Sequence, residues 1–121
     1  MARTKPRIQN LPRNLKPYFL AIFRPGECWN QIEGAEDLPA RQLAFLRAQF
    51  DAGVYRVAGP VTDGGEIAAM AILEAENLDS ARAIAMQDPG VQEARLTVEV
   101  HSVLLPSLNS VQVIYEQGKS S

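Results

Sequence analysis

Two side chains in the second half of the chain could exchange a proton. Asp88 stands directly before Pro89, and His101 is the only histidine among the 121 residues. A carboxylate and an imidazole suit general acid–base chemistry, because imidazole titrates near neutral pH and both groups carry protons. Each also has a plainer interpretation. An aspartate before proline can form a turn by bonding nearby backbone amides, and a single histidine can bond a partner at an interface.

Three other charged residues are candidates for holding a substrate. Arg24 follows the first apolar segment, where a guanidinium could bind a carboxylate or phenolate. Arg56 lies within an apolar segment, so it either caps a sheet edge or points into a pocket. Glu99 is two residues from His101 and shares its face in a strand. The carboxylates near His101 lack the spacing of metal ligands, so we expect no metal and no cofactor.

The stretch 38–60 predicts a helix that ends at a glycine and is followed by a strand. Leu43, Leu46 and Phe50 recur at three- and four-residue spacing, which puts them on one helical face. Gly53 follows the last of them, and a residue without Cβ ends a helix at least cost. The β-branched and aromatic residues after Gly53 favour a strand.

Three further strands and a second helix complete the pattern. Residues 18–23 and 67–73 are apolar throughout, which predicts strands covered on both faces. Asn77 is a natural N-cap for a helix that ends at Asp88, because proline disfavours helix in the residue before it. Residues 95–105 alternate between valines on one face and polar residues on the other.

The resulting order is strand, helix, strand, strand, helix, strand. This is the ferredoxin-like βαββαβ pattern of an α+β protein, with a four-stranded antiparallel sheet and two helices on one face. The helices cannot cover the other face, yet two strands are apolar on both sides. A second copy packed sheet against sheet is the simplest cover, so we expect a homodimer or higher homo-oligomer.

Composition limits the other function classes. A net charge of −2 gives no reason to expect nucleic acid or an anionic membrane as a partner. No apolar run approaches the ~20 residues of a membrane span, and the single cysteine excludes a disulfide within the chain. The start of the sequence lacks the apolar core of a secretory signal, so a cytoplasmic protein is expected.

Domain boundaries follow from changes in composition. Residues 17–106 form the α+β domain. Residues 1–16 are basic and proline-rich, which predicts either an arm for nucleic acid or an acidic partner, or a solvated leader laid over a neighbour. Residues 107–121 form an extension, in which the apolar run 111–115 suggests a short extra strand.

Two runs and the last strand resemble the YCII-related (YciI-like) domain family. The runs are QLAFLRAQFDAGVYRVAGP and GGEIAAMAILEAENLDSARAIAMQDP, and the strand ends at Leu105–Pro106. The resemblance covers about residues 17–106 and implies a dimeric α+β barrel. It also implies a pocket in which a helix histidine and the aspartate of an Asp-Pro pair are the acid–base pair. Most members have no settled activity, although relatives include a dehydrochlorinase of a chlorinated hydroxyquinol.

The sequence departs from this family at the histidine. Asp88 stands at the family's aspartate position, but the histidine position falls on Gln42. Glutamine can orient a substrate and cannot abstract a proton, so His101 is the candidate replacement. Two functions remain open. One is a cofactor-free enzyme of lyase or isomerase type acting by proton transfer on a small aromatic or enolisable compound. The other is a non-catalytic dimeric barrel that binds a metabolite or serves a structural role.

Overall fold

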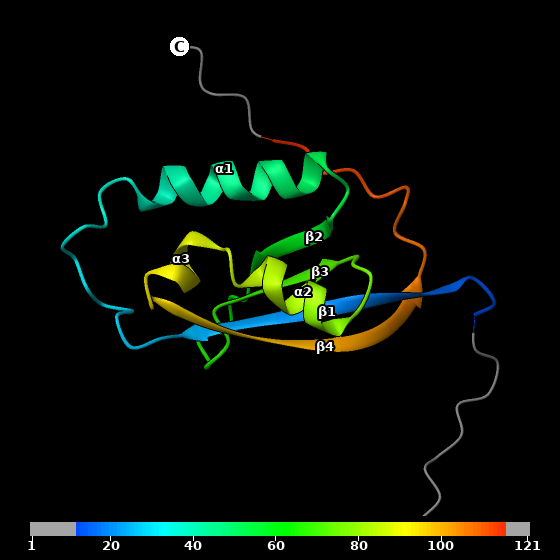
Figure 1. Ribbon diagram of the computed structural model, residues 1–121, viewed down its shortest axis with the longest axis horizontal. Coiled ribbons are helices and arrows are strands. Elements are labelled where there is room, and N and C mark those ends of the chain that lie inside the picture. The colour runs from blue at the N-terminus through cyan, green and yellow to red at the C-terminus, as the bar shows by residue number, and fades with distance from the viewer. Residues whose placement is uncertain (1–11, 116–121) are drawn as a thin grey trace, which may run out of the picture.

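The computed structural model describes residues 12–115. Figure 1 shows the elements, which are, in chain order, β1 (Leu15–Pro25), α1 (Leu38–Asp51), β2 (Tyr55–Pro60), β3 (Ala69–Leu73), α2 (Leu78–Ala85), α3 (Pro89–Gln92) and β4 (Leu96–Pro106). The predicted order of strands and helices is confirmed, and the short helix α3 is an addition that the sequence pattern did not predict.

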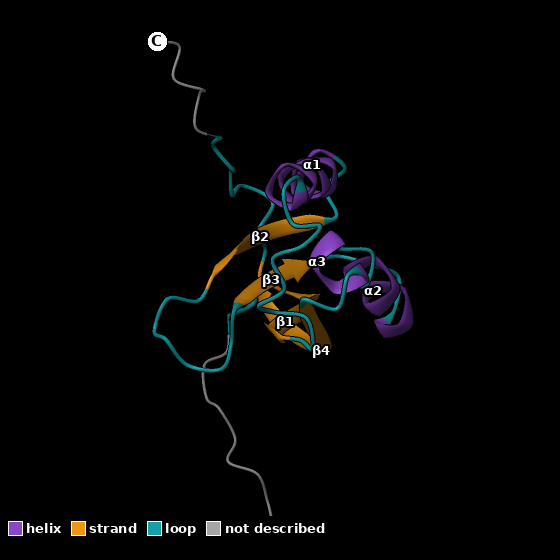
Figure 2. Ribbon diagram, turned by 90° about the vertical axis from the view of Figure 1, so that its left-hand side faces the viewer, coloured by secondary structure: helices purple, strands orange, loops and turns teal. Residues whose placement is uncertain are grey.

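The four strands form one antiparallel sheet in the order β2-β3-β1-β4. In Figure 2 the three helices of residues 12–115 lie on one side of the strands, and none of these residues forms a helix on the other side. This arrangement is the predicted α+β, ferredoxin-like fold. Below, the side that carries the helices is called the helix face, and the opposite side is called the open face.

Helix α1 presents a different set of residues to the sheet from the one its leucines suggest. Leu43 is 49% exposed, so its prediction as a core residue was wrong. The predicted Leu46 and Phe50 do pack against the core, and Phe45 packs there with them. Gln42 lies one helical turn before Phe45 and Leu46, so the same spacing carries it to the inner side. After the helix, Gly53 has a φ of 75°, as a glycine stop requires.

Helices α2 and α3 meet at the Asp-Pro pair. The Asn77 side chain accepts a hydrogen bond from the Ser80 amide at 2.8 Å, which confirms the predicted N-cap. Helix α2 ends at Ala85, before the proline can interrupt it. Pro89 then begins α3, because proline suits a first helical turn whose amides have no partner within the helix.

The core lies between the helices and the helix face of the sheet. Its buried members are hydrophobic side chains from all four strands and α2, namely Ala21, Phe23, Tyr55, Ala71, Leu73, Ala81, Ala85 and Val100. On the open face, Leu20 and Ile22 of β1 and Met70 of β3 are only partly buried. The part of the open face formed by these β1 and β3 residues is therefore apolar, as the sequence predicts.

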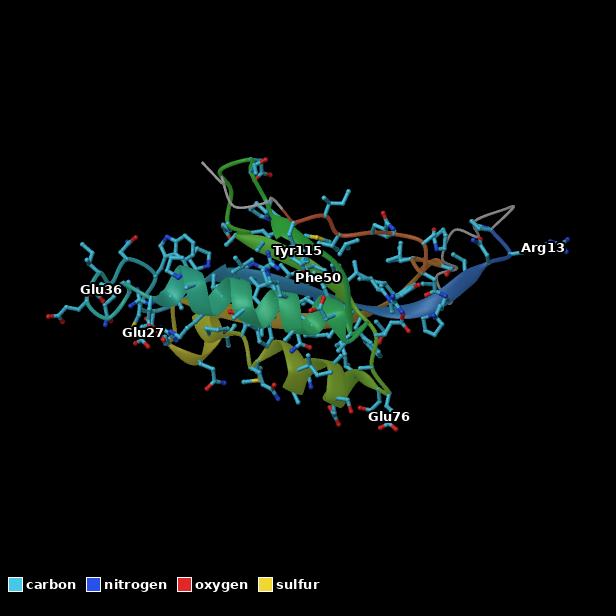
Figure 3. The ribbon with its side chains drawn as sticks, turned by 90° about the horizontal axis from the view of Figure 1, so that it is seen from above. Arg13, Glu27, Glu36, Phe50, Glu76 and Tyr115 are labelled. Carbon is cyan, nitrogen blue, oxygen red and sulfur yellow. The ribbon has the colours of Figure 1, made fainter. Side chains whose placement is uncertain are left out.

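The segment after β4 contains no strand up to Tyr115, although its apolar run suggests one. Its backbone turns at Leu108, whose amide donates to the Tyr18 hydroxyl at 2.7 Å. Tyr115 then stacks beneath the Arg47 guanidinium at 3.9 Å and beside Phe50 (Figure 3). The segment thus joins the end of β4 to the C-terminal end of α1.

The predicted basic arm 1–16 divides between two regions. Its first eleven residues lie outside the described part of the chain, while Leu15 and Lys16 already belong to β1. Among residues 12–115, none of the helices has the length and apolar character needed to cross a lipid bilayer.

Candidate functional site

Asp88 and Gln42 meet on the helix face. Asp88 is 3% exposed and lies at the N-cap of α3. Its Oδ1 accepts a hydrogen bond from the Gly90 amide at 2.7 Å, and its Oδ2 accepts one from Gln42 Nε2 at 2.5 Å. The first bond is the turn-forming contact expected of an aspartate before proline. The second oxygen faces α1 and has a side-chain amide as its partner.

The glycine after Pro89 holds this aspartate in place. A Cβ on Gly90 would lie 2.8 Å from Leu96 Cδ1 and 3.1 Å from Asp88 Oδ1. Glycine therefore allows the start of β4 to pack directly against the turn that carries the carboxylate. In the Asp-Pro-Gly sequence, Pro89 thus begins α3, and Gly90 leaves the space that the Asp88 side chain and Leu96 need.

Tyr55 completes the polar group and was missed in the sequence analysis. Its ring is 2% exposed and packs edge-to-face on Phe45 and Phe50. The buried hydroxyl has no hydrogen-bond partner among residues 12–115. Burial, reinforced by the negative charge of Asp88, raises the pKa of Tyr55, so the phenol stays protonated and needs an acceptor.

A signal for Tyr55 is present in the sequence. The residue opens a strand directly after the glycine stop of α1, and the phenol is the one hydroxyl in that strand. Periodicity alone treats it as an aromatic core residue, because the unpartnered hydroxyl becomes visible only after the surrounding side chains are placed.

A cavity of about 430 Å³ adjoins these three residues. Most of its wall is apolar, including Phe23, Leu46, Ala58, Ala69 and Leu96. Gln42, Tyr55 and Asp88 supply the polar part of the lining. A mostly apolar cavity with a few convergent polar groups is typical of a small-molecule site.

His101 lies on the open face and does not pair with Asp88. In the register of β1 with β4, Val100 opposes the core residue Ala21, so the flanking residues Glu99 and His101 point to the opposite side. The His101 Nε2 atom lies 2.7 Å from Glu99 Oε2. The predicted Asp88–His101 proton exchange is therefore wrong in its geometry, because the sheet separates the two side chains.

Arg24 also belongs to this open-face group. Its guanidinium pairs with Glu99, which also bonds His101. The hydrogen bond from His101 lowers the pKa of Glu99, and the Arg24 contact adds to it against the opposing effect of burial. Arg24 and Glu99 thus pair with each other and do not line the cavity beside Asp88, although both were predicted to bind the substrate.

Arg56 caps an edge of the sheet. The register of β2 with β3 shifts between Tyr55 and Val57, and Arg56 lies at this shift. Its Nε donates to Glu74 Oε2 at 2.6 Å, and Lys16 lies 3.3 Å from the same carboxylate group. Burial would raise the pKa of Glu74, but these two cations lower it overall. Of the two interpretations of Arg56, the structure shows the edge contact.

Potential metal ligands do not cluster in the described part of the chain. Between residues 12 and 115, no group of three or more His, Cys, Asp or Glu side chains is arranged to hold an ion. The site that remains is Asp88, Gln42 and Tyr55 at their cavity. Of the predicted site residues, only Asp88 and Gln42 lie there.

Comparisons with known proteins identify the family of the chain. The chain resembles a solved structure, the 5-chloro-2-hydroxyhydroquinone dehydrochlorinase of Burkholderia phenoliruptrix in complex with 2,5-dihydroxybenzoquinone, with a TM-score of 0.54 and 21% identity. That match covers 69% of this chain and 90% of the other. No curated protein sequence matches the chain. The model of the YCII-related domain matches residues 18–103. The chain therefore belongs to the YCII-related domain family.

Proposed function

We propose that the protein is a cofactor-free enzyme of lyase or isomerase type that transfers a proton on a small aromatic or enolisable compound. The observation that carries this proposal is the Asp88 carboxylate, which is buried at a mostly apolar cavity and, within residues 12–115, accepts hydrogen bonds from two amides. None of the ion pairs among residues 12–115 includes Asp88. Burying a carboxylate without a cation is costly, and such groups cluster at functional sites.

The three polar residues can divide the work of one proton transfer. Asp88 Oδ2 takes a proton from an acidic O–H or C–H of the bound compound, and the electron pair moves into its conjugated system. The Tyr55 hydroxyl donates a hydrogen bond to the oxygen on which negative charge develops. Asp88 then returns the proton at another position, or a leaving group departs with the electron pair and Asp88 releases the proton to water. Gln42 holds the carboxylate in place throughout.

The structural neighbour supports the class of compound. Its ligand, 2,5-dihydroxybenzoquinone, is a planar oxygenated ring. A ring of this kind suits a cavity of about 430 Å³ whose polar groups converge on one side. The likeness itself shows the fold, so the substrate class proposed for this chain depends on the chemistry of its own cavity.

The non-catalytic alternative is favoured by one observation, the amide at position 42. Gln42 is the hydrogen-bonded side-chain neighbour of Asp88, and an amide does not titrate. A protein that only binds a metabolite would keep the cavity and the polar contacts and would have no need of a second proton carrier. The two functions differ in turnover and share the binding site.

A turnover assay with a Gln42→His variant separates these alternatives. Chlorinated hydroquinones and enolisable β-dicarbonyl compounds are incubated with the protein, and chloride release and the ultraviolet spectrum are followed. We expect slow turnover by the natural chain. Gln42→His is expected to raise the rate and to add a pH dependence near neutrality, because an imidazole beside Asp88 can carry the proton. Binding of these compounds without turnover in either protein would establish the alternative.

We also propose that the protein is a homodimer that packs the open face of one sheet against that of a second copy. Leu20, Ile22 and Met70 contribute partly buried apolar surface to this face. The Arg24–Glu99–His101 group would then lie inside the interface as its polar part. Light scattering should give twice the chain mass. Ile22→Asp should give the monomer mass, since it buries an unpaired charge in the dimer. A monomeric natural chain would contradict the dimer.

A further inference from the structure

A second cavity lies beside the Asp88 site. It has a volume of about 540 Å³ and lies between the loop that follows β1 and the first turn of α1. Its wall includes Ile32, Ala35 and Leu38. Trp29, Gln42 and Leu96 line both cavities, so the two adjoin along these side chains.

Three polar groups at the second cavity, the Arg95 guanidinium, the Gly90 amide and the Gln42 side chain, already have partners. Arg95 is 7% exposed, and its guanidinium donates to the backbone carbonyls of Gln31 and Glu33 and lies near the Glu93 carboxylate. The Gly90 amide and the Gln42 side chain both donate to Asp88. A charged ligand group would find no free counter-charge here, whereas an apolar group would lose nothing by leaving water.

The loop that follows β1 forms the outer wall of this cavity and is bound to residues 94 and 95. The amides of Gly26 and Cys28 donate to the carbonyls of Arg95 and Ala94 at 2.8 and 2.7 Å, and Arg95 binds the middle of the loop. Two large apolar side chains of the loop remain in contact with water, since Trp29 is 47% and Ile32 is 86% exposed. An apolar group in the cavity would cover part of this surface.

We propose that the second cavity is a subsite for an apolar substituent of the substrate. The inference rests on the proposed function, in which the reacting ring or enol lies against Asp88. The substrate class is then an aromatic or enolisable compound that carries an alkyl or aryl group, and Trp29 lies at the junction of the two parts. Because the two cavities share part of their walls, one ligand can occupy both. Because the polar groups named above already have partners, the part of the ligand in the second cavity is expected to be apolar rather than anionic.

Calorimetric titration with para-methylphenol, para-propylphenol and para-pentylphenol tests the subsite. The affinity of the natural chain is expected to rise about three- to fourfold for each methylene that becomes fully buried. Fluorescence of Trp29, the only tryptophan of the chain, gives a second readout at the junction. The longer phenols should change this signal more than para-methylphenol does.

Two variants change the second cavity without touching the first. Ile32→Asp places a charge at its rim, and Ile114→Asp is the matched control, since Ile114 is 85% exposed and lies in the segment after β4. Ala35→Phe fills the cavity, and Ala44→Phe on the exposed side of α1 is its control. Ile32→Asp and Ala35→Phe should abolish the gain with chain length and leave para-methylphenol binding unchanged. The controls should keep the gain.

The outcomes separate the subsite from the proposed function. If para-methylphenol binds and the longer phenols bind no tighter, the subsite is wrong while proton transfer at Asp88 stands. The subsite is equally wrong if the gain with chain length survives in Ile32→Asp and Ala35→Phe, or if none of the phenols binds. The proposed function fails instead when compounds bind and are not turned over, which the chloride and spectral assay measures independently.

Discussion

Replacement of Asp88 by asparagine is expected to reduce turnover about 10²- to 10⁴-fold, the usual contribution of a positioned acid–base group. The substitution keeps the size of the side chain and removes its ability to carry the proton. The asparagine oxygen can still accept from the Gly90 amide, and Gln42 can rotate its amide to offer an oxygen to the new NH₂ group. The fold should therefore survive, and the loss should appear in kcat.

The matched control for this experiment is Asp51→Asn. Asp51 is the last residue of α1 and is exposed, so the substitution removes the same charge far from the cavity. Its turnover should equal that of the natural chain. Circular dichroism and thermal unfolding check that both variants are folded. Full activity of folded Asp88→Asn would exclude Asp88 as the proton carrier and would leave the carboxylate with its structural role at the start of α3.

Replacement of Leu73 by alanine is expected to cause the largest loss of stability, about 2–5 kcal/mol in the free energy of unfolding. Leu73 is fully buried and lies between Phe19 of β1 and Tyr55 of β2 in the sheet register. Truncation removes apolar contacts with both neighbours and leaves a cavity that these aromatic rings can only partly fill. For a domain of this size the melting temperature should fall by roughly 10–20 °C.

Leu104→Ala provides the comparison for this prediction. Leu104 lies in β4 and is 63% exposed, so the same truncation should change the free energy of unfolding by no more than about 0.5 kcal/mol. Urea unfolding of both variants measures the difference directly. Equal losses at the two positions would show that Leu73 is not in the closed core. Leu73 would then not hold the Tyr55 ring in place either.

The sequence identified Gln42 as a site residue, and the tertiary structure shows its contact with Asp88. The resemblance to the family placed Gln42 and Asp88 at the two positions of an acid–base pair. In the structure Gln42 Nε2 lies 2.5 Å from Asp88 Oδ2, although the two residues are 46 positions apart in the chain. The helical spacing that carries Phe45 and Leu46 inward also carries Gln42, so its orientation was present in the pattern. Of the predicted pattern Leu43, Leu46 and Phe50, only Leu43 lies away from the core.

The error over His101 has a simple physical origin. Alternation in a strand predicts which residues share a face, and it correctly grouped Glu99 with His101. It does not say which face the helices cover. Asp88 was assigned to the same enclosed space without any contact to support the assignment. The packing of α3 decides the matter, because the Gly90 turn holds Asp88 on the helix face.

The sequence by itself determined the order of the four strands and of α1 and α2, the glycine stop at Gly53, the N-cap at Asn77 and the family. These features depend on neighbours within a few residues, where periodicity and backbone preference act directly. Only the tertiary structure decided that Tyr55 has a buried hydroxyl without a partner and that the sheet separates Asp88 from His101. Both facts depend on which surfaces exclude water, and this is settled by contacts between segments distant in the chain.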